Sequence, residues 1–337
     1  MKIRPFFGHA ARKDTAWYRH GLLRLGGLAV GMTFGAAVGM AQEAATQGKH
    51  RIVASDGVAV AQAEGKASVS RSWPGHAMAG KAMDALANAR GLSESAPELA
   101  ALMRLPAVSA GLGQESIFPP DTRVRVNPTT GFPARATVLV TFSAGRCSGW
   151  LIGANTVITA GHCVHPGGGG SFYPTSSYRI YPGRNGAASP YGSCTARWVA
   201  SVAGWTVNGD DQYDYGAIKL NCTIGNTTGW YGFFWQTASL TGLPTIINGY
   251  PGDKPLTQWQ SKGKVTVTQT RRVFYRNDTI GGVSGSPVWY NRAGCGICSM
   301  AVHAYGAYGS PPFSTNNHGT RIVKAVFDNF VAWRNAA

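Results

Sequence analysis

The sequence predicts an all-β domain over residues 116–337 that ends in a single helix. Short runs rich in Val, Ile, Thr and aromatic residues are separated there by Gly, Pro, Asn and Asp, which is the pattern of short strands joined by turns. The chain of 337 residues is 44% hydrophobic and 14% charged, so it can bury a core and is not disordered. Its 45 glycines have no fixed period, which excludes a collagen-like protein.

The expected strands follow one another along this segment. They lie at residues 136–142, 157–160, 198–202, 217–220 and 265–270. The expected helix covers residues 321–333, at the end of the chain. A segment of this length forms one sandwich or barrel, or two small barrels packed together.

Residues 1–41 have the organisation of a signal peptide. Basic residues precede an apolar run at 25–40, and Gly39-Met40-Ala41 supplies the small residues that a signal peptidase requires. The alternative is a membrane anchor, but 16 residues rich in Gly are short for a transmembrane helix. We therefore expect a secreted protein, extracellular or periplasmic, with no stable membrane insertion after the signal is removed.

Residues 42–115 are interpreted as a propeptide. They contain no Cys and are rich in Ala, Gly and Ser, in contrast to the domain that follows. Residues 75–105 have helical periodicity, but no pattern there indicates chemistry. The alternative interpretation is a flexible linker.

The net charge of +16 does not indicate a nucleic-acid partner. The domain 116–337 contains 18 Lys and Arg against seven acids, and these basic residues are dispersed, with Arg271-Arg272 as the one dyad. Nucleic-acid binding would require clustered charge or a recognisable motif. The charge is expected to contribute to solubility or to association with the cell wall.

Two short motifs supply a histidine and an acid. In TAGHC, a strand-like run leads through small residues to His162, so that a substrate could approach the imidazole closely. In DYGAIKL, Asp214 precedes another strand-like run, which suits a buried carboxylate that orients an imidazole. Taken alone, Asp214 would be an ordinary turn residue, and Asp210 and Asp211 are nearby competitors.

The third motif, GGVSGSPV, supplies a serine. Glycines on both sides of Ser284 permit a tight loop that exposes its hydroxyl and turns backbone N–H groups toward one point. Such a loop predicts an oxyanion hole, with the amides of Gly282 and Ser284 as donors.

The chain order His162, Asp214, Ser284 is itself informative. Hydrolases with a nucleophile elbow have the order Ser, acid, His. Only His303 and His318 follow Ser284, and no acid lies between Ser284 and either of them, so that order is excluded. The order His, Asp, Ser is that of chymotrypsin-like enzymes.

With these three motifs, the segment 116–337 resembles the chymotrypsin-like serine proteases. The strings NGYPGDKP (248–255) and NDTIGGVSGSPVW (277–289) are similar to the bacterial glutamyl endopeptidase branch. The resemblance implies two six-stranded antiparallel β-barrels with the triad between them. It also implies a nucleophile Ser284, a base His162, an orienting Asp214, and protein or peptide substrates. No cofactor is expected, a structural calcium ion cannot be read from the sequence, and the enzyme is expected to be a monomer.

The resemblance offers two interpretations of substrate specificity. It implies that His303, with the hydroxyl of Thr279, binds the carboxylate of a glutamate before the scissile bond. Asp278 lies six residues before Ser284, however, where a trypsin-like enzyme has the acid that binds Arg or Lys. Composition favours the first interpretation, because residues 116–337 contain no Glu, and a protease that cuts after Glu could not easily digest itself.

All six cysteines lie in the domain 116–337, and export favours their pairing. Cys147 and Cys163 lie sixteen residues apart and could clamp the loop that carries His162. The resemblance includes a small bridge that matches Cys295 and Cys298, which leaves Cys194 to pair with Cys222. A zinc site made of Cys295, Cys298, His303 and His318 is the alternative. A catalytically inactive homologue that binds acidic polymers is a third hypothesis.

Activation is expected to differ from that of chymotrypsin. There, an Asp immediately before the catalytic Ser binds the new N-terminal amine, whereas this chain has Val283. Activation would instead remove residues 42–115 from the cleft. Glu115-Ser116 is the expected boundary, because Glu115 is the last Glu in the chain. The resemblance implies that the freed Ser116 amine helps His303 to neutralise the substrate carboxylate.

Overall fold

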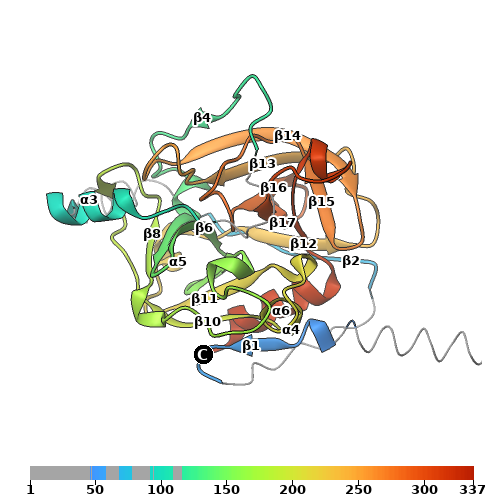
Figure 1. The fold of residues 1–337 in the computed structure, drawn as a ribbon, viewed down its shortest axis with the longest axis horizontal. Coiled ribbons are helices and arrows are strands. Elements are labelled where there is room, and N and C mark those ends of the chain that lie inside the picture. Colours follow the sequence, from blue (N-terminus) through green and yellow to red (C-terminus); the bar gives the residue numbers. More distant parts are fainter. Residues whose placement is uncertain (1–45, 47, 58–67, 78–91, 94, 109–115) are drawn as a thin grey trace, which may run out of the picture. The chain divides into compact units, whose positions relative to one another are not determined.

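The computed structural model describes residues 46, 48–57, 68–77, 92–93, 95–108 and 116–337 (Figure 1). All of these residues belong to one compact unit, Ala45–Ala337. The expected signal peptide 1–41 lies outside the described residues, as do Glu115 and residues 78–91 of the expected helical stretch. No helix among the described residues has the length and apolar character needed to cross a bilayer.

The second half of the domain contains a closed six-stranded barrel. Its strands are, in spatial order, β16 (Pro287–Arg292), β13 (Pro244–Gly249), β14 (Trp259–Thr268), β15 (Arg272–Tyr275), β18 (Asn317–Arg321) and β17 (Gly296–Tyr305). The pairing of β17 with β16 closes the ring, so its edges are not exposed. The adjoining strands β4 (Val124–Arg125) and β12 (Gly232–Gln236) pair with β14 and β17.

The first half forms a second antiparallel sheet. Its strands are, in spatial order, β10 (Ala196–Val202), β11 (Gly216–Leu220), β7 (Thr156–Thr159), β6 (Gly145–Leu151), β5 (Thr137–Phe142) and β8 (Arg179–Pro182). An isolated bridge between Ile180 and Cys194 joins β8 to the residues just before β10. The expected strands 136–142, 157–160, 198–202, 217–220 and 265–270 coincide with β5, β7, β10, β11 and the second half of β14.

Segments from the expected propeptide form strands that pair with strands of the domain, which the sequence did not predict. Two of these strands extend the two large sheets, and the third takes part in a separate two-stranded sheet. Strand β1 (Ile52–Ala54) pairs with β10, β2 (Ser70–Trp73) pairs with β12, and β3 (Leu92–Ser93) pairs with β9 (Ala188–Ser189). Strands as short as these have too few residues to show an alternating pattern in the sequence. Their partner strands supply the hydrogen bonds that hold them in place.

Helix α3 (Ala96–Arg104) begins with a capping box. The side chain of Glu98 accepts hydrogen bonds from the N–H of Ser95, at 2.9 Å, and from its hydroxyl, at 2.7 Å. Leu99 and Leu102 pack against a cluster that contains Tyr181 and Leu256. After this helix the chain runs beside β6, where Pro106 and Val108 form backbone hydrogen bonds with Arg146.

The C-terminal helix α6 (Lys324–Asn335) begins three residues later than expected. Phe327, Phe330 and Trp333 are fully buried, as their spacing along one face requires, and they pack into the core around Tyr215. The ammonium group of Lys219 donates to the carbonyl oxygens of Trp333 and Arg334, both at 3.3 Å. A cation at this end of a helix satisfies its last carbonyl groups.

Three disulfide bonds tie the loops to the sheets. They join Cys147 to Cys163, Cys194 to Cys222, and Cys295 to Cys298, in the expected pairing. The first of them links β6 to the short helix η2 (Gly161–Cys163), which carries His162.

Trp333→Ala is expected to lower the free energy of unfolding by about 3–5 kcal/mol, because it leaves a cavity beneath α6. The measurement is urea denaturation of the protein in the Ser284→Ala background, where self-digestion cannot interfere. The control is Lys324→Ala, which removes only a pair with Asp328 near the surface and should cost about 0.5 kcal/mol or less. Equal losses in both variants would contradict the packing role of Trp333.

Candidate active site

His162 and Asp214 form a buried pair. The Nδ1 atom of His162 lies 2.8 Å from Oδ2 of Asp214, and the backbone N–H of His162 donates to Oδ1 at 2.8 Å. The carboxylate therefore fixes both the ring and the backbone of the histidine. Because a carboxylate accepts the hydrogen on Nδ1, the neutral ring has its basic lone pair on Nε2.

The surroundings of this pair leave little freedom to move. Gly161 has no room for a side chain, since a Cβ there would lie 2.9 Å from Oδ1 of Asp214 and 2.8 Å from Cδ1 of Trp205. Thr320 of β18 donates its hydroxyl to the carbonyl oxygen of Asp214 at 2.9 Å. The acid is thus held by residues of both sheets.

Ser284 lies on a loop that only glycine permits at two positions. Gly282 has φ +99° and Gly285 has φ +87°, and a Cβ on Gly285 would lie 2.2 Å from the carbonyl oxygen of Ser148. The carbonyl oxygen of Ser284 accepts the N–H of Ser148 at 2.8 Å and lies 3.9 Å from Sγ of Cys163. Cys163, the residue after His162, therefore contacts this loop. Residues 280–286 are called the nucleophile loop below, after the expected role of Ser284.

The Ser148 side chain supports the same loop from behind. Its hydroxyl donates to the carbonyl oxygen of Gly282 at 2.8 Å and accepts the N–H of Tyr250 at 2.9 Å. Ser148 is fully buried, so these bonds do not compete with water. They fix the peptide plane beside Gly282, which is one of the two expected oxyanion-hole residues.

His303 lies on β17, directly behind the nucleophile loop. Its backbone N–H donates to Ser286 at 2.9 Å, and its carbonyl oxygen accepts the N–H of Gly285 at 2.8 Å. The ring is fully buried, and its Nδ1 atom lies 2.7 Å from the hydroxyl of Tyr275 on β15. His303, the expected specificity residue, is therefore bonded through its backbone to the two residues that follow Ser284, the expected nucleophile.

Thr279 and Ser116 lie close to each other beside this strand. The N–H of Thr279 donates to the carbonyl oxygen of Ser116 at 3.2 Å. The Thr279 hydroxyl is fully buried and has no hydrogen-bond partner among the described residues. A hydroxyl in this state costs about 1–3 kcal/mol, which a ligand could recover.

Asn317 of β18 holds Ser116 in place. Its Oδ1 atom accepts the N–H of Ser116 at 2.9 Å, and its Nδ2 atom donates to the carbonyl oxygen of Ser116 at 2.6 Å. The Ser116 hydroxyl also accepts the N–H of Ala307 at 3.1 Å. The sequence did not single out Asn317 or Tyr275, because neither lies in a recognisable motif.

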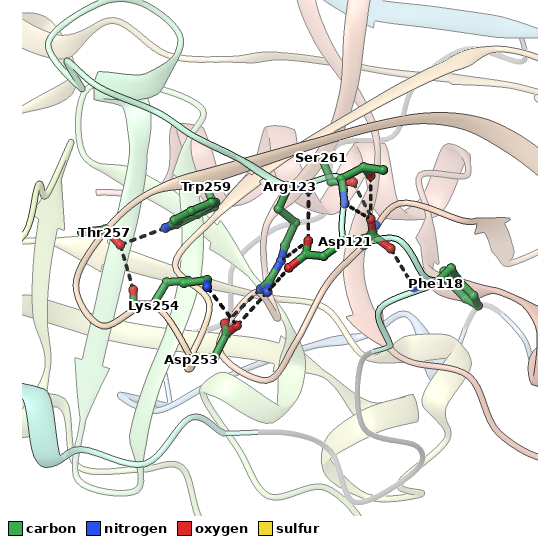
Figure 2. A network of polar contacts seen from close by, with 10 residues as sticks. Phe118, Asp121, Arg123, Asp253, Lys254, Thr257, Trp259 and Ser261 are labelled. Atoms are coloured by element: carbon green, nitrogen blue, oxygen red, sulfur yellow. Dashed lines mark hydrogen bonds and ion pairs between the residues drawn. The ribbon is translucent and has the colours of Figure 1, made fainter.

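Asp278 has both carboxylate oxygens occupied by the chain near Ser116. One accepts the N–H of Phe118 at 2.8 Å, and the other accepts the N–H and hydroxyl of Thr122 at 2.8 and 2.6 Å. Its own N–H donates to the hydroxyl of Ser261 at 2.8 Å. Figure 2 shows Phe118 and Ser261, which bond to Asp278, together with the cluster in which Arg123 bridges Asp121 and Asp253.

Comparison with known proteins places this geometry in a family. A family model for the trypsin-like peptidase domain matches residues 147–296. A glutamyl endopeptidase from Bacillus licheniformis is 46% identical over 228 residues, covering 66% of this chain and 70% of that protein. The chain belongs to the glutamyl endopeptidase family. It is therefore a serine endopeptidase, and its fold is mostly β and chymotrypsin-like.

Two further similarities extend across the same region. A Bacillus subtilis protein named extracellular metalloprotease is 40% identical over 232 residues, covering 66% of this chain and 71% of that protein. A solved structure of a Glu endopeptidase in complex with MPD matches with a TM-score of 0.55 at 30% identity. That match covers 65% of this chain and all of the solved chain.

The zinc site considered in the sequence analysis does not fit the side chains of this protein. Cys295 and Cys298 are joined in a disulfide, so they offer no thiolates to a metal. Cys147, His162 and Cys163 also cluster, but the two cysteines are again bonded to each other. His318 is buried among aromatic rings, and its burial lowers its pKa to about 3, which keeps it neutral.

Asp214→Asn is expected to lower kcat by about 10⁴-fold with little change in fold, because an amide does not hold His162 in the required tautomer. The measurement is peptide hydrolysis together with circular dichroism. The matched control is Asp211→Asn, three residues earlier, whose carboxylate pairs instead with Arg272. Similar losses from both substitutions would show that general charge, and not the His162 contact, matters.

Proposed function

We propose that this chain is the precursor of a secreted, monomeric endopeptidase that cuts after glutamate. The observation that carries the proposal is the placement of His303 and the unpartnered Thr279 hydroxyl beside the loop of Ser284. The name of the Bacillus licheniformis relative supports the same specificity. Its substrates are proteins or peptides, and no cofactor takes part in the proposed reaction.

The proposed reaction proceeds through an acyl-enzyme. The Ser284 hydroxyl attacks the carbonyl carbon before the scissile bond while Nε2 of His162 accepts its proton. The amides of Gly282 and Ser284 stabilise the negative oxygen of the tetrahedral intermediate. His162 then protonates the leaving amine, Asp214 stabilises the imidazolium, and water hydrolyses the ester on Ser284.

The proposed pocket recognises a carboxylate by hydrogen bonds. If the Tyr275 hydroxyl donates to Nδ1 of His303, the ring hydrogen lies on Nε2, where it can donate to a substrate. The Thr279 hydroxyl supplies a second donor. A glutamine substrate offers one oxygen and an unwanted amide donor, so such a site should discriminate against it.

Asp278 is assigned a structural role in this proposal. A trypsin-like pocket needs a carboxylate directed at the substrate cation, whereas the oxygens of Asp278 bind the backbone of Phe118 and Thr122. In this role Asp278 anchors the segment that follows Ser116. This arrangement favours glutamate specificity over the alternative of cleavage after Arg or Lys.

Residues 42–115 are proposed to be an inhibitory propeptide, after a signal peptide at 1–41. The carbonyl oxygen of Pro106 accepts the N–H of Arg146 at 2.9 Å, and the N–H of Val108 donates to the carbonyl oxygen of Arg146 at 3.0 Å. A Cβ built on Gly282 would lie 3.4 Å from that of Ala107. A chain in this position obstructs the approach to the proposed oxyanion hole.

Maturation is proposed to occur at Glu115-Ser116. Cleavage there would convert the Ser116 amide, which now donates to Asn317, into an ammonium group close to Thr279. That charge could help to neutralise the substrate carboxylate. Loss of β1 would also leave six strands in the first sheet, so that the mature enzyme would have two six-stranded barrels.

His303→Ala is expected to lower kcat/KM for peptides with Glu before the scissile bond by about 100-fold, because the carboxylate loses a matched donor. Acylation by p-nitrophenyl acetate, which has no such carboxylate, should change by less than about threefold. The two rates are measured on the same mature protein. An equal fall in both rates would indicate damage to the triad, and unchanged cleavage after Glu would contradict the pocket assignment.

Glu115→Gln is expected to prevent formation of the Ser116 N-terminus, because the enzyme would not recognise the altered boundary. The measurement is N-terminal sequencing of the secreted wild type, Glu115→Gln and Ser284→Ala proteins. Only the wild type should begin at Ser116. A Ser116 start in the Ser284→Ala protein would assign the cleavage to another protease, and a distant wild-type start would refute the boundary.

A further inference from the structure

A cavity of about 300 Å³ lies between the propeptide segment and the nucleophile loop. Pro106 and Ala107 line it on one side, and Arg146, Gly252 and Gly281 line it on the other. We propose that, once the propeptide has left, Arg146 binds an acidic side chain on the leaving-group side of the substrate. This inference rests on the proposed function and adds a second position of specificity to it.

Arg146 has donor groups that no described residue uses. Its side chain is only 5% exposed, and its Nη2 atom donates to the carbonyl oxygen of Gly252 at 3.0 Å. The Nε and Nη1 atoms are buried and have no hydrogen-bond partner among the described residues. A buried guanidinium with unused donors is costly, so the arrangement favours a ligand that completes it.

The chemistry of the site selects a carboxylate. A guanidinium presents parallel N–H groups that match the two oxygens of Asp or Glu, and such paired bonds are strong when water is excluded. Burial also lowers the pKa of Arg146, because removal from water disfavours the charged guanidinium, a cost that a nearby anion would compensate. An arriving carboxylate would supply that compensation.

Asp253 also lines the cavity, but it is engaged elsewhere. Its two oxygens accept hydrogen bonds from Nη1 and Nη2 of Arg123 at 2.9 and 2.7 Å (Figure 2). Lys254 lies 4.0 Å from the same carboxylate and adds further positive charge. Because Arg123 also pairs with Asp121, the two cations balance two carboxylates, and this cluster adds no net negative charge beside the cavity.

The position of Arg146 in the cleft assigns it to the leaving-group side. His303 contacts the nucleophile loop through β17, whereas Arg146 lies on β6, two residues before Ser148, which donates to Ser284. A substrate with its glutamate at His303 would direct the residues after the scissile bond toward β6. The backbone bonds of Arg146 to Pro106 and Val108 demonstrate that an extended chain fits there.

The test uses mature enzyme secreted from the full chain and pairs of internally quenched peptides. The peptides in each pair share a Glu before the scissile bond and differ only in Asp or Asn at the first or second position after it. We expect the wild type to prefer Asp by about tenfold in kcat/KM at one of these positions. Arg146→Gln should reduce that ratio to about one.

Arg197→Gln is the matched control, because this exposed arginine lies on β10, which β11 and β7 separate from β6. It should retain the wild-type ratio. Absence of an Asp preference in the wild type at both positions would overturn the inference, as would an unchanged ratio in Arg146→Gln. If that variant does not fold, Arg146→Lys decides, because it keeps the charge but loses the paired donors and should lower the ratio severalfold.

The same peptides with Gln in place of Glu before the scissile bond separate the two proposals. If the wild type does not distinguish Glu from Gln there, the proposed function fails whatever Arg146 does. If it prefers Glu and yet ignores Asp or Asn beyond the bond, only the role of Arg146 is refuted.

Discussion

The rest of the site depends on one buried carboxylate, that of Asp214. Its two oxygens bind the ring and the backbone of His162, and Thr320 from the other sheet holds its carbonyl oxygen. A fully buried charge without such partners would be too costly to keep. The carboxylate is bound by His162, and the second sheet holds the backbone of Asp214, so the histidine receives its orientation at the junction of the two sheets.

The nucleophile loop has a similar dependence on its two neighbours. Strand β6 supplies Ser148, which bonds to Ser284 and Gly282, and strand β17 supplies the backbone of His303, which bonds to Gly285 and Ser286. The proposed nucleophile and the proposed specificity residue thus share one support. In the proposed enzyme, the pocket for the substrate carboxylate could not shift without moving the nucleophile, which couples specificity to rate.

The sequence predicted the parts of this protein that are local. His162, Asp214 and Ser284 each lie in a short string whose chemistry is visible, and β5 and β7 have the apolar residues of buried strands. Strand β6, with the sequence GRCSGWL, lacks that signal and was missed. Asn317 and Tyr275 were missed because they become neighbours only through the register of β15 and β18. The strands β1 and β2 of the proposed propeptide were missed because the sheet edges that they pair with lie far along the chain.

The distribution of glutamate would make the proposed activation self-accelerating and irreversible. All five glutamates of the chain lie in residues 42–115, the proposed propeptide, and one of them, Glu98, caps α3. An enzyme that cuts after glutamate would therefore digest the propeptides of neighbouring precursors while sparing every mature domain. A population of precursors would then remain inactive during an initial lag, and its conversion to the mature enzyme would accelerate as active molecules accumulate. No molecule could return to the inhibited form, because its propeptide would have been cleaved at several glutamates.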